Sequence, residues 1–206
     1  MKKMYNFIGI VGTNSEQSTN RTLLQFMQKH FKKDAKIELL EIGDLPMFNK
    51  PSDKKIPARA TELATKIDQA DGIIISTPEY DHAVPAVLVN ALHWLSYGVF
   101  PFVDQPVMIT GASYGTLGSS RAQAQLRQIL DSPELKARIM PSSDYLLAHS
   151  LQAFDQEGNL IHSDDLARLD ELFDDFLTFV SITQQMHLNR EDHKKKAARF
   201  NWDKLN

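Results

Sequence analysis

Short apolar runs alternate with longer amphipathic segments along most of this 206-residue chain, and the alternation restricts the folds it can adopt. The clearest run, Gly72–Ser76, contains three consecutive isoleucines. A strand this uniformly apolar is typical of a parallel sheet that helices cover on both faces. Further strands are expected at Tyr5–Val11, Lys36–Ile42, Pro106–Thr110 and at one of two weaker candidates, Ile139–Pro141 or Tyr145–Leu147.

The amphipathic segments carry apolar residues at helical spacing. They predict helices over Arg21–Phe31, Ala58–Gln69, Pro85–Leu95, Ser120–Leu130 and Asp165–Gln184. Strands that alternate with helices indicate an α/β fold with a parallel sheet. Five strands fit a flavodoxin-like doubly wound sheet, with helices on both faces, better than a six-stranded dinucleotide fold. In such sheets ligands bind at the carboxyl ends of the strands, so the loops after the first, third and fourth strands are expected to carry the chemistry.

Composition excludes several classes of function. A net charge of -3 argues against a general nucleic-acid binder, and no apolar run approaches the ~20 residues that span a membrane. The chain has no cysteine, which rules out disulfides and thiolate chemistry and favours a cytoplasmic location. Seven histidines occur without a metal-binding motif, so no metal is expected.

Residues 1–186 are expected to form one domain, and residues 187–206 a basic C-terminal extension. The extension contains three consecutive lysines at 194–196, followed by Phe200 and Trp202. It is interpreted as a solvated helix or a disordered segment. The alternative is that Phe200 and Trp202 dock onto a partner subunit.

The first loop, Gly12–Asn20, is rich in hydroxyl and amide side chains. Thr13, Ser15, Ser18 and Asn20 could donate hydrogen bonds to a phosphate, which the start of the following helix also favours. The loop lacks the glycine patterns of triphosphatases and dinucleotide folds, and so suits a single terminal monophosphate. The alternative is an ordinary capped turn, because the same residue types are common there.

The other two loops suit a flat ligand. The loop Thr77–Pro85 contains two prolines, which suggests a rigid backbone that could hydrogen-bond the edge of a planar ring. Tyr80 could pack against such a ring. Gly111–Arg121 contains three glycines, which permit close backbone approach, and Tyr114 could cover such a ring. The alternatives are a loop that closes at Pro85 on the first turn of a helix, and a flexible connection.

Together these loops, with Leu88–Trp94 and the run that continues to Arg127, resemble the motifs of the NAD(P)H-dependent FMN reductase family, over roughly Tyr5 to Phe179. That family includes quinone, chromate and azo-dye reductases. The resemblance implies that the phosphate of FMN binds the first loop. The isoalloxazine edge would meet the second loop, and the other side of the ring the third. The implied cofactor-binding residues are Thr13, Ser15, Ser18, Asn20, Pro78, Glu79, Tyr80, Asp81, Ser113, Tyr114 and Gly115.

Four positions differ from the family pattern in ways that bear on FMN affinity and redox potential. Ser15 replaces an arginine, Asp81 an asparagine, Ala83 a hydroxyl residue and His93 an aspartate. The family also implies a homodimer or homotetramer, with Pro85–Ser96 and Arg121–Leu130 at the interface.

The resemblance implies ping-pong chemistry. NADPH or NADH passes a hydride to the flavin, which then reduces a quinone, azo, flavin or similar small acceptor. No catalytic side chain is assigned, because the flavin performs the chemistry. His82 and Arg121 could touch phosphates of the nucleotide, or could be an exposed loop histidine and a helix-capping residue. Two alternatives stay open: an FMN-binding electron carrier that needs a partner reductase, and a non-enzymatic binding protein.

Overall fold

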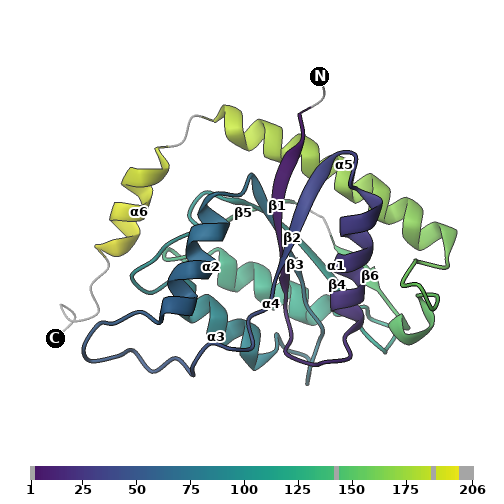
Figure 1. Cartoon of the computed structure of the whole chain (residues 1–206), viewed down its shortest axis with the longest axis horizontal. Helices are drawn as coiled ribbons and strands as arrows, with labels where there is room; N and C mark the ends of the chain where they lie inside the picture. The colour runs from purple at the N-terminus through teal and green to yellow at the C-terminus, as the bar shows by residue number, and fades with distance from the viewer. Residues whose placement is uncertain (1–2, 142–143, 187–188, 200–206) are drawn as a thin grey trace.

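One parallel sheet forms the centre of the computed structural model, which describes residues 3–141, 144–186 and 189–199 (Figure 1). The strands follow the order β2-β1-β3-β4-β5, with β6 also paired to β4, and all pairs are parallel. This topology confirms the flavodoxin-like doubly wound fold. The strands are β1 Tyr5–Val11, β2 Ala35–Leu40, β3 Gly72–Ser76, β4 Pro106–Ala112, β5 Arg138–Ile139 and β6 Tyr145–Leu147.

The two weak strand candidates share the fifth position in the sheet. Arg138 of β5 lies opposite Pro106, and Tyr145 of β6 lies opposite Thr110, so the two strands pair with successive parts of β4. Arg127 holds the chain between them by donating to the carbonyl of Met140 at 3.0 Å. The edge of the sheet is therefore one strand position that two short strands fill in succession.

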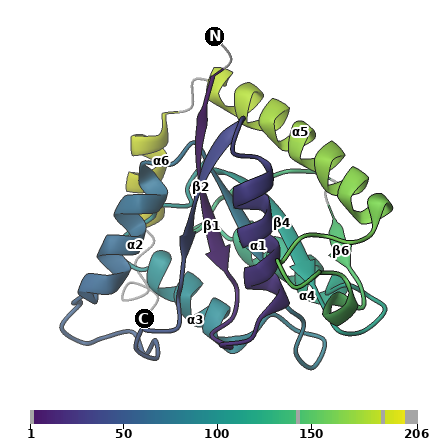
Figure 2. The same ribbon diagram turned by 45° about the vertical axis from the view of Figure 1, so that its right-hand side comes forward.

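Helices cover both faces of the sheet. The helices are α1 Thr19–His30, α2 Ala58–Asp68, α3 Ala86–Leu95, α4 Ser120–Leu130, α5 Ser163–Gln185 and α6 Arg190–Ala198, with a short 3-10 helix, η1, at Ser150–Gln152. Apolar residues of α2, α3 and α4 form the core on one face, and those of α1 and α5 form the core on the other (Figures 1 and 2). Ile73 and Ile75 point into the first core and Ile74 into the second, which explains the continuous isoleucine run.

The helix α6, within the expected C-terminal extension, is held to the body beside α2 (Figure 2). Arg190 donates to the carbonyl of Val103 at 2.7 Å and pairs with Asp68 at 2.8 Å. His193 contacts the buried carboxylate of Asp104, on the loop before β4. Phe200 and Trp202 lie outside the described residues, so their docking and the division at residue 187 stay predictions.

Among the helices of the described ranges, none combines the length and the apolar character that crossing a membrane requires.

Candidate functional site

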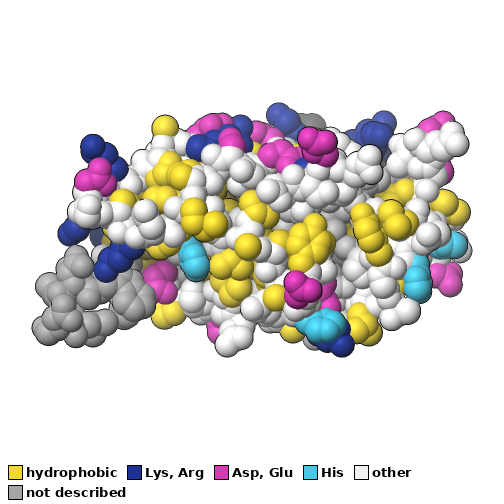
Figure 3. Space-filling model, turned by 90° about the horizontal axis from the view of Figure 1, so that it is seen from below, with side chains coloured by type: hydrophobic (Ala, Val, Ile, Leu, Met, Phe, Trp, Pro, Cys, Tyr) yellow, Lys and Arg dark blue, Asp and Glu magenta, His cyan; other side chains and the backbone are white. Residues whose placement is uncertain are grey.

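The three loops predicted to bind a ligand meet at the carboxyl edge of the sheet, because β1, β3 and β4 are neighbours. Figure 3 looks onto this edge and shows several hydrophobic patches across the face, with charged and histidine side chains among and around them. The backbones approach closely here. A Cβ added at Gly12 would lie 2.6 Å from the carbonyl oxygen of Ser76, so glycine is needed where the first loop leaves β1.

Asn20 joins the ends of two strands to the first helix. Its Oδ1 accepts from the Ser76 hydroxyl at 2.9 Å and from the Ala112 N–H at 2.9 Å, and its Nδ2 donates to the Ala112 carbonyl at 2.8 Å. We call these three bonds the Asn20 clasp. The side chain is buried, and its bonds hold the frame of the loops. Its predicted contact with a phosphate stays a prediction.

The hydroxyls of the first loop differ in their surroundings. Thr13 is buried, and its Oγ1 accepts from the Ser15 N–H and shares a hydrogen bond of 3.1 Å with the Tyr80 hydroxyl. Ser18 is the N-cap of α1 and accepts from the Arg21 N–H. Ser15 donates to the carbonyl of Gln17. Thr13 thus links the first loop to the second, while Ser15 and Ser18 lie nearer the surface.

The backbone of the first loop offers an anion site. Within the described ranges, the N–H groups of residues 16–20 have no hydrogen-bond acceptor. Unpaired N–H groups at a helix start attract phosphate, and the helix dipole adds to the attraction. This cradle fits a terminal phosphate monoester.

Arg21 supports this loop from α1, although Ser15 replaces the usual arginine. Its Nη1 donates to the carbonyls of Ser15 at 2.7 Å and Glu16 at 3.1 Å. Its other two nitrogens pair with the Glu41 carboxylate at 2.6 and 2.9 Å. A cation therefore fixes the loop backbone even though position 15 carries none.

The second loop contains a tight turn. Tyr80 and Ala83 exchange two backbone hydrogen bonds of 3.1 and 2.9 Å, which leaves Asp81 and His82 as the two turn residues. Both have positive φ, 49° and 64°, as a type I′ hairpin turn requires. Asparagine, aspartate and glycine are the usual residues there, so His82 at the second position is the residue that strains this turn.

Glu79 connects the second loop to the third. Its Oε2 accepts the N–H groups of Arg121 at 2.9 Å and Ala122 at 3.1 Å, so it caps the start of α4. Burial raises the pKa of Glu79, but the hydrogen bonds from the Ala122 N–H and from the backbone and side chain of Arg121 outweigh it, and the pKa lies below its ordinary value. The carboxylate is therefore ionised at neutral pH and locks two of the three loops together.

The third loop is hydrogen-bonded to the end of β6 and the residues after it, for which the sequence analysis predicted no role in the site. The Ser113 N–H donates to the Leu147 carbonyl, and the His149 N–H donates to that of Gly115. The Ser150 hydroxyl shares a 2.8 Å hydrogen bond with Thr19 at the start of α1. The signal available in the sequence was the weak strand Tyr145–Leu147, whose carboxyl end must reach the same edge of the sheet.

Two tyrosines present rings on this edge. Tyr80 of the second loop is 50% exposed, and Tyr114 of the third is 59% exposed. Pro78 is buried, whereas Asp81 and Gly115 are exposed, and a Cβ at Gly115 would meet open space. Exposed aromatic rings around an anion cradle suit a ligand that has both a flat ring and a phosphate.

Other residues of the matched motifs are structural. Asn90 and Trp94 both donate to the carbonyl of Pro46, at 3.1 and 2.7 Å, and so hold the preceding loop on α3. His93 is exposed and lines a groove of about 490 Å³ with aromatic and aliphatic neighbours. The apolar lining residues of this groove, the α3/α4 groove, are Phe48, Leu92, Tyr97, Ile129 and Leu135.

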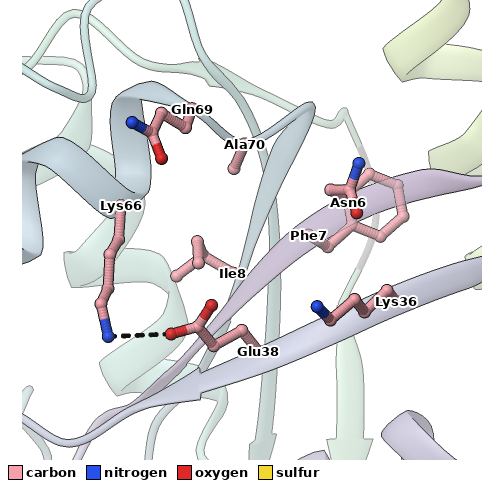
Figure 4. Close-up of a pocket in the computed structure, with 8 residues that line it drawn as sticks. All are labelled: Asn6, Phe7, Ile8, Lys36, Glu38, Lys66, Gln69 and Ala70. Atoms are coloured by element: carbon pink, nitrogen blue, oxygen red, sulfur yellow. Dashed lines mark hydrogen bonds and ion pairs between the residues drawn. The ribbon is translucent and has the colours of Figure 1, made fainter.

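A second, smaller cavity of about 190 Å³ lies between α2 and the strands β1 and β2 (Figure 4). Its lining includes the ion pair of Lys66 and Glu38, whose charged atoms are 2.9 Å apart. The cavity borders the amino-terminal half of β1, away from the three loops, and is no part of the candidate site. Across the described ranges, no group of three or more His, Asp or Glu side chains is placed to hold a metal ion.

Comparison with known proteins agrees with this geometry. Residues 5–152 match the model of the NADPH-dependent FMN reductase family. The chain is 55% identical over 197 residues to NADH:(hydroxy)cinnamate reductase subunit CrdA of Vibrio ruber, covering 96% of this chain and 97% of that protein. It is 39% identical to NADH-dependent flavin reductase subunit 2 of Lactobacillus johnsonii, covering 86% and 98%. Among solved structures, the flavoenzyme NAD(P)H:(acceptor) oxidoreductase FerB of Paracoccus denitrificans matches with a TM-score of 0.77 and 26% identity, covering 87% and 98%.

The predicted family, the oxidoreductase class and FMN as cofactor are confirmed by these matches. The anion cradle and the exposed tyrosines fit that cofactor independently of the matches. The chain belongs to the NADPH-dependent FMN reductase family.

Proposed function

We propose that this chain holds FMN at the carboxyl edge of its sheet and oxidises NADH there. The observation that carries the proposal is the set of acceptor-free N–H groups at residues 16–20, which lie beside two exposed tyrosines. Bound FMN supplies the redox chemistry, accepting a hydride from the nucleotide and giving electrons to an acceptor.

The side chains of the loops would position the cofactor. The N–H cradle, with the hydroxyls of Ser15 and Ser18, would bind the phosphate. The second loop, stiffened by the Tyr80 bond to Thr13 and the Glu79 cap, would present backbone groups to the ring edge. Tyr114 would cover part of the ring, which leaves the remaining face to the nucleotide and the acceptor in turn.

NADH is the proposed reductant because the CrdA subunit of Vibrio ruber and the flavin reductase subunit of Lactobacillus johnsonii are both named for NADH. Both are also named as subunits. We therefore propose that this chain passes electrons to a small organic acceptor or to a partner subunit, and that it assembles through the α3/α4 groove. A cytoplasmic location, favoured by the absence of cysteine, is part of the same proposal.

The test is the visible spectrum of the purified protein loaded with FMN, recorded without oxygen before and after NADH is added. We expect a bound-flavin spectrum that bleaches within the mixing time of a manual experiment. A bound spectrum that NADH and NADPH leave yellow, but dithionite bleaches, would replace the reductase with an electron carrier. A protein that retains no flavin would contradict the proposal.

A further inference from the structure

Three side chains form a contact cluster at the rim of the candidate site. Arg121, in the first turn of α4, places Nη1 2.8 Å from His82 Nδ1 and 3.3 Å from the Glu79 carboxylate. The side chain of Glu79 is only 10% exposed, whereas those of His82 and Arg121 are 72% and 49% exposed. We call these residues the rim cluster.

The contact between Arg121 and His82 determines which nitrogen of the imidazole carries the proton. A guanidinium can only donate, so His82 Nδ1 must accept at the 2.8 Å contact, and the ring proton lies on Nε2. The 3.4 Å contact of the same nitrogen with Glu79 is longer and gives way to it. His82 thus presents an N–H donor on the side of the ring that faces away from Arg121.

The guanidinium of Arg121 has further N–H donors that are available to a ligand. Both hydrogens of Nη1 are used by Glu79 and His82, while Nε and Nη2 have no acceptor among the described residues. The charge of Glu79 is already shared with two backbone N–H groups. The rim cluster, which lies beside a strained turn, therefore offers two exposed donors. They are the cationic fork of Arg121 Nε and Nη2, and the neutral N–H of His82.

The position of these donors selects their ligand. They extend from the second and third loops, which also carry Tyr80 and Tyr114. Within the proposed function, the nicotinamide of NADH would stack on the bound ring between these loops. Its diphosphate, one ribose away, would then reach the rim, whereas the 2′-phosphate of NADPH would lie farther out on the adenosine.

We propose that Arg121 and His82 bind the diphosphate bridge of the pyridine nucleotide and so set the affinity for the reductant. This inference rests on the proposed function. A guanidinium fork matches two phosphate oxygens, and the His82 N–H matches a third. The exposed carboxylate of Asp81, in the same turn, opposes binding and keeps the site weak enough to release the product.

The experiment compares two reductants on the FMN-loaded protein: NADH, and 1-benzyl-1,4-dihydronicotinamide, which has no phosphate. The variants are Arg121→Gln and His82→Asn, because asparagine tolerates the left-handed turn that His82 occupies. Lys33→Gln removes an exposed cation at the opposite edge of the sheet and is the control. Calorimetry with the non-reducing analogue tetrahydro-NAD measures binding without turnover.

For Arg121→Gln we expect the KM for NADH and the Kd for tetrahydro-NAD to rise about tenfold, the loss of a charged hydrogen bond. We expect kcat and the rate with the phosphate-free reductant to stay within about twofold of the original values. The reason is that Arg121 would contribute equally to binding in the ground state and the transition state, so its loss raises KM and leaves kcat unchanged. His82→Asn gives a smaller rise of the same kind, and Lys33→Gln none.

Equal losses with both reductants would overturn the inference, because they indicate a structural role in the loops. So would an unchanged KM for NADH in Arg121→Gln. If neither reductant bleaches the flavin, the proposed function fails, and the tetrahydro-NAD titration alone then decides whether the rim cluster binds a diphosphate.

Discussion

At the scale of single residues, Ser18 combines two roles that one substitution separates. It caps α1 through the Arg21 N–H, and it lies within the N–H cradle proposed for the FMN phosphate. Aspartate caps helices as well as serine does, but it adds a negative charge. Ser18→Asp therefore keeps the helix and repels the phosphate.

We expect Ser18→Asp to raise the Kd for FMN at least about tenfold, or ~1.4 kcal/mol, through charge repulsion in the cradle. Riboflavin, which has no phosphate, should bind the variant and the original protein equally, as measured by quenching of flavin fluorescence. The melting temperature of the cofactor-free protein should not fall. Equal weakening for both flavins would mean that the phosphate binds elsewhere.

Several residue roles could not be predicted from local motifs. Asn20 was predicted to contact the phosphate, and no motif indicated the hydrogen bonds that it makes with Ser76 and Ala112 inside the protein. Glu79 was expected at the flavin edge and also caps α4, a contact with residues 42 and 43 positions away. Thr13 and Tyr80 share a hydrogen bond that joins the first two loops, and their contacts with the cofactor stay predictions.

At the scale of elements, the position of α6 depends on one buried carboxylate. The Asp104 side chain is 1% exposed and pairs with Arg138 at 2.8 Å and with His193 of α6. Burial raises the pKa of Asp104, but the hydrogen bonds from His193 and Arg138 outweigh it, and the pKa falls below its ordinary value. A lowered pKa stabilises the fold above the unfolded value, about 3.9, and this stabilisation is lost as the pH falls through the folded value.

We expect Asp104→Asn to lower the free energy of unfolding in urea by about 2 kcal/mol at pH 7, because it leaves Arg138 and His193 without their carboxylate partner. The difference from the original protein should shrink as the pH falls below about 4, through the lowered pKa of the folded state. Amide hydrogens of α6 should exchange faster in the variant. Asp174→Asn, on the exposed side of α5, is the control and should change neither quantity. A difference that stays constant with pH would contradict the assignment.

The main elements were predictable because each central strand is a short apolar run that the helices bury on both sides. The predicted strands Tyr5–Val11 and Gly72–Ser76 have the same bounds in the structure, and so does the helix Ser120–Leu130. The edge of the sheet at β5 and β6 was not predictable in the same way. Two residues of β5 carry too little pattern, and the contact of Arg127 with the Met140 carbonyl just after β5 comes from α4. The docking of α6 depends on ion pairs with residues 89 and 126 positions away, which no local pattern reveals.

At the scale of the whole molecule, the α3/α4 groove is the surface proposed for assembly. It coincides with the helices that the family resemblance assigned to an interface, and its lining is mostly apolar. Covering an apolar groove of this kind with another chain is favourable, because apolar surface is removed from water. The described residues do not fill it.

We expect the purified protein to sediment at twice the 23.4 kDa of one chain, or at four times that mass. Ile129→Lys places a charge in the groove and should shift the protein to the mass of one chain. Ile182→Lys, the same substitution at an exposed position of α5, should leave the assembly intact. A variant at position 129 that keeps the original mass would show that this groove is not the interface.

The Asn20 clasp has a consequence for the thermodynamics of cofactor loading. Because three internal hydrogen bonds already fix the strand ends, FMN meets a formed site and no segment has to fold around it. The heat-capacity change on binding should therefore be small and negative, of the size set by the apolar surface of the ring alone, whereas coupled folding would make it much more negative. The enthalpy of loading would then change little with temperature, and the affinity would reside in the phosphate and ring contacts themselves.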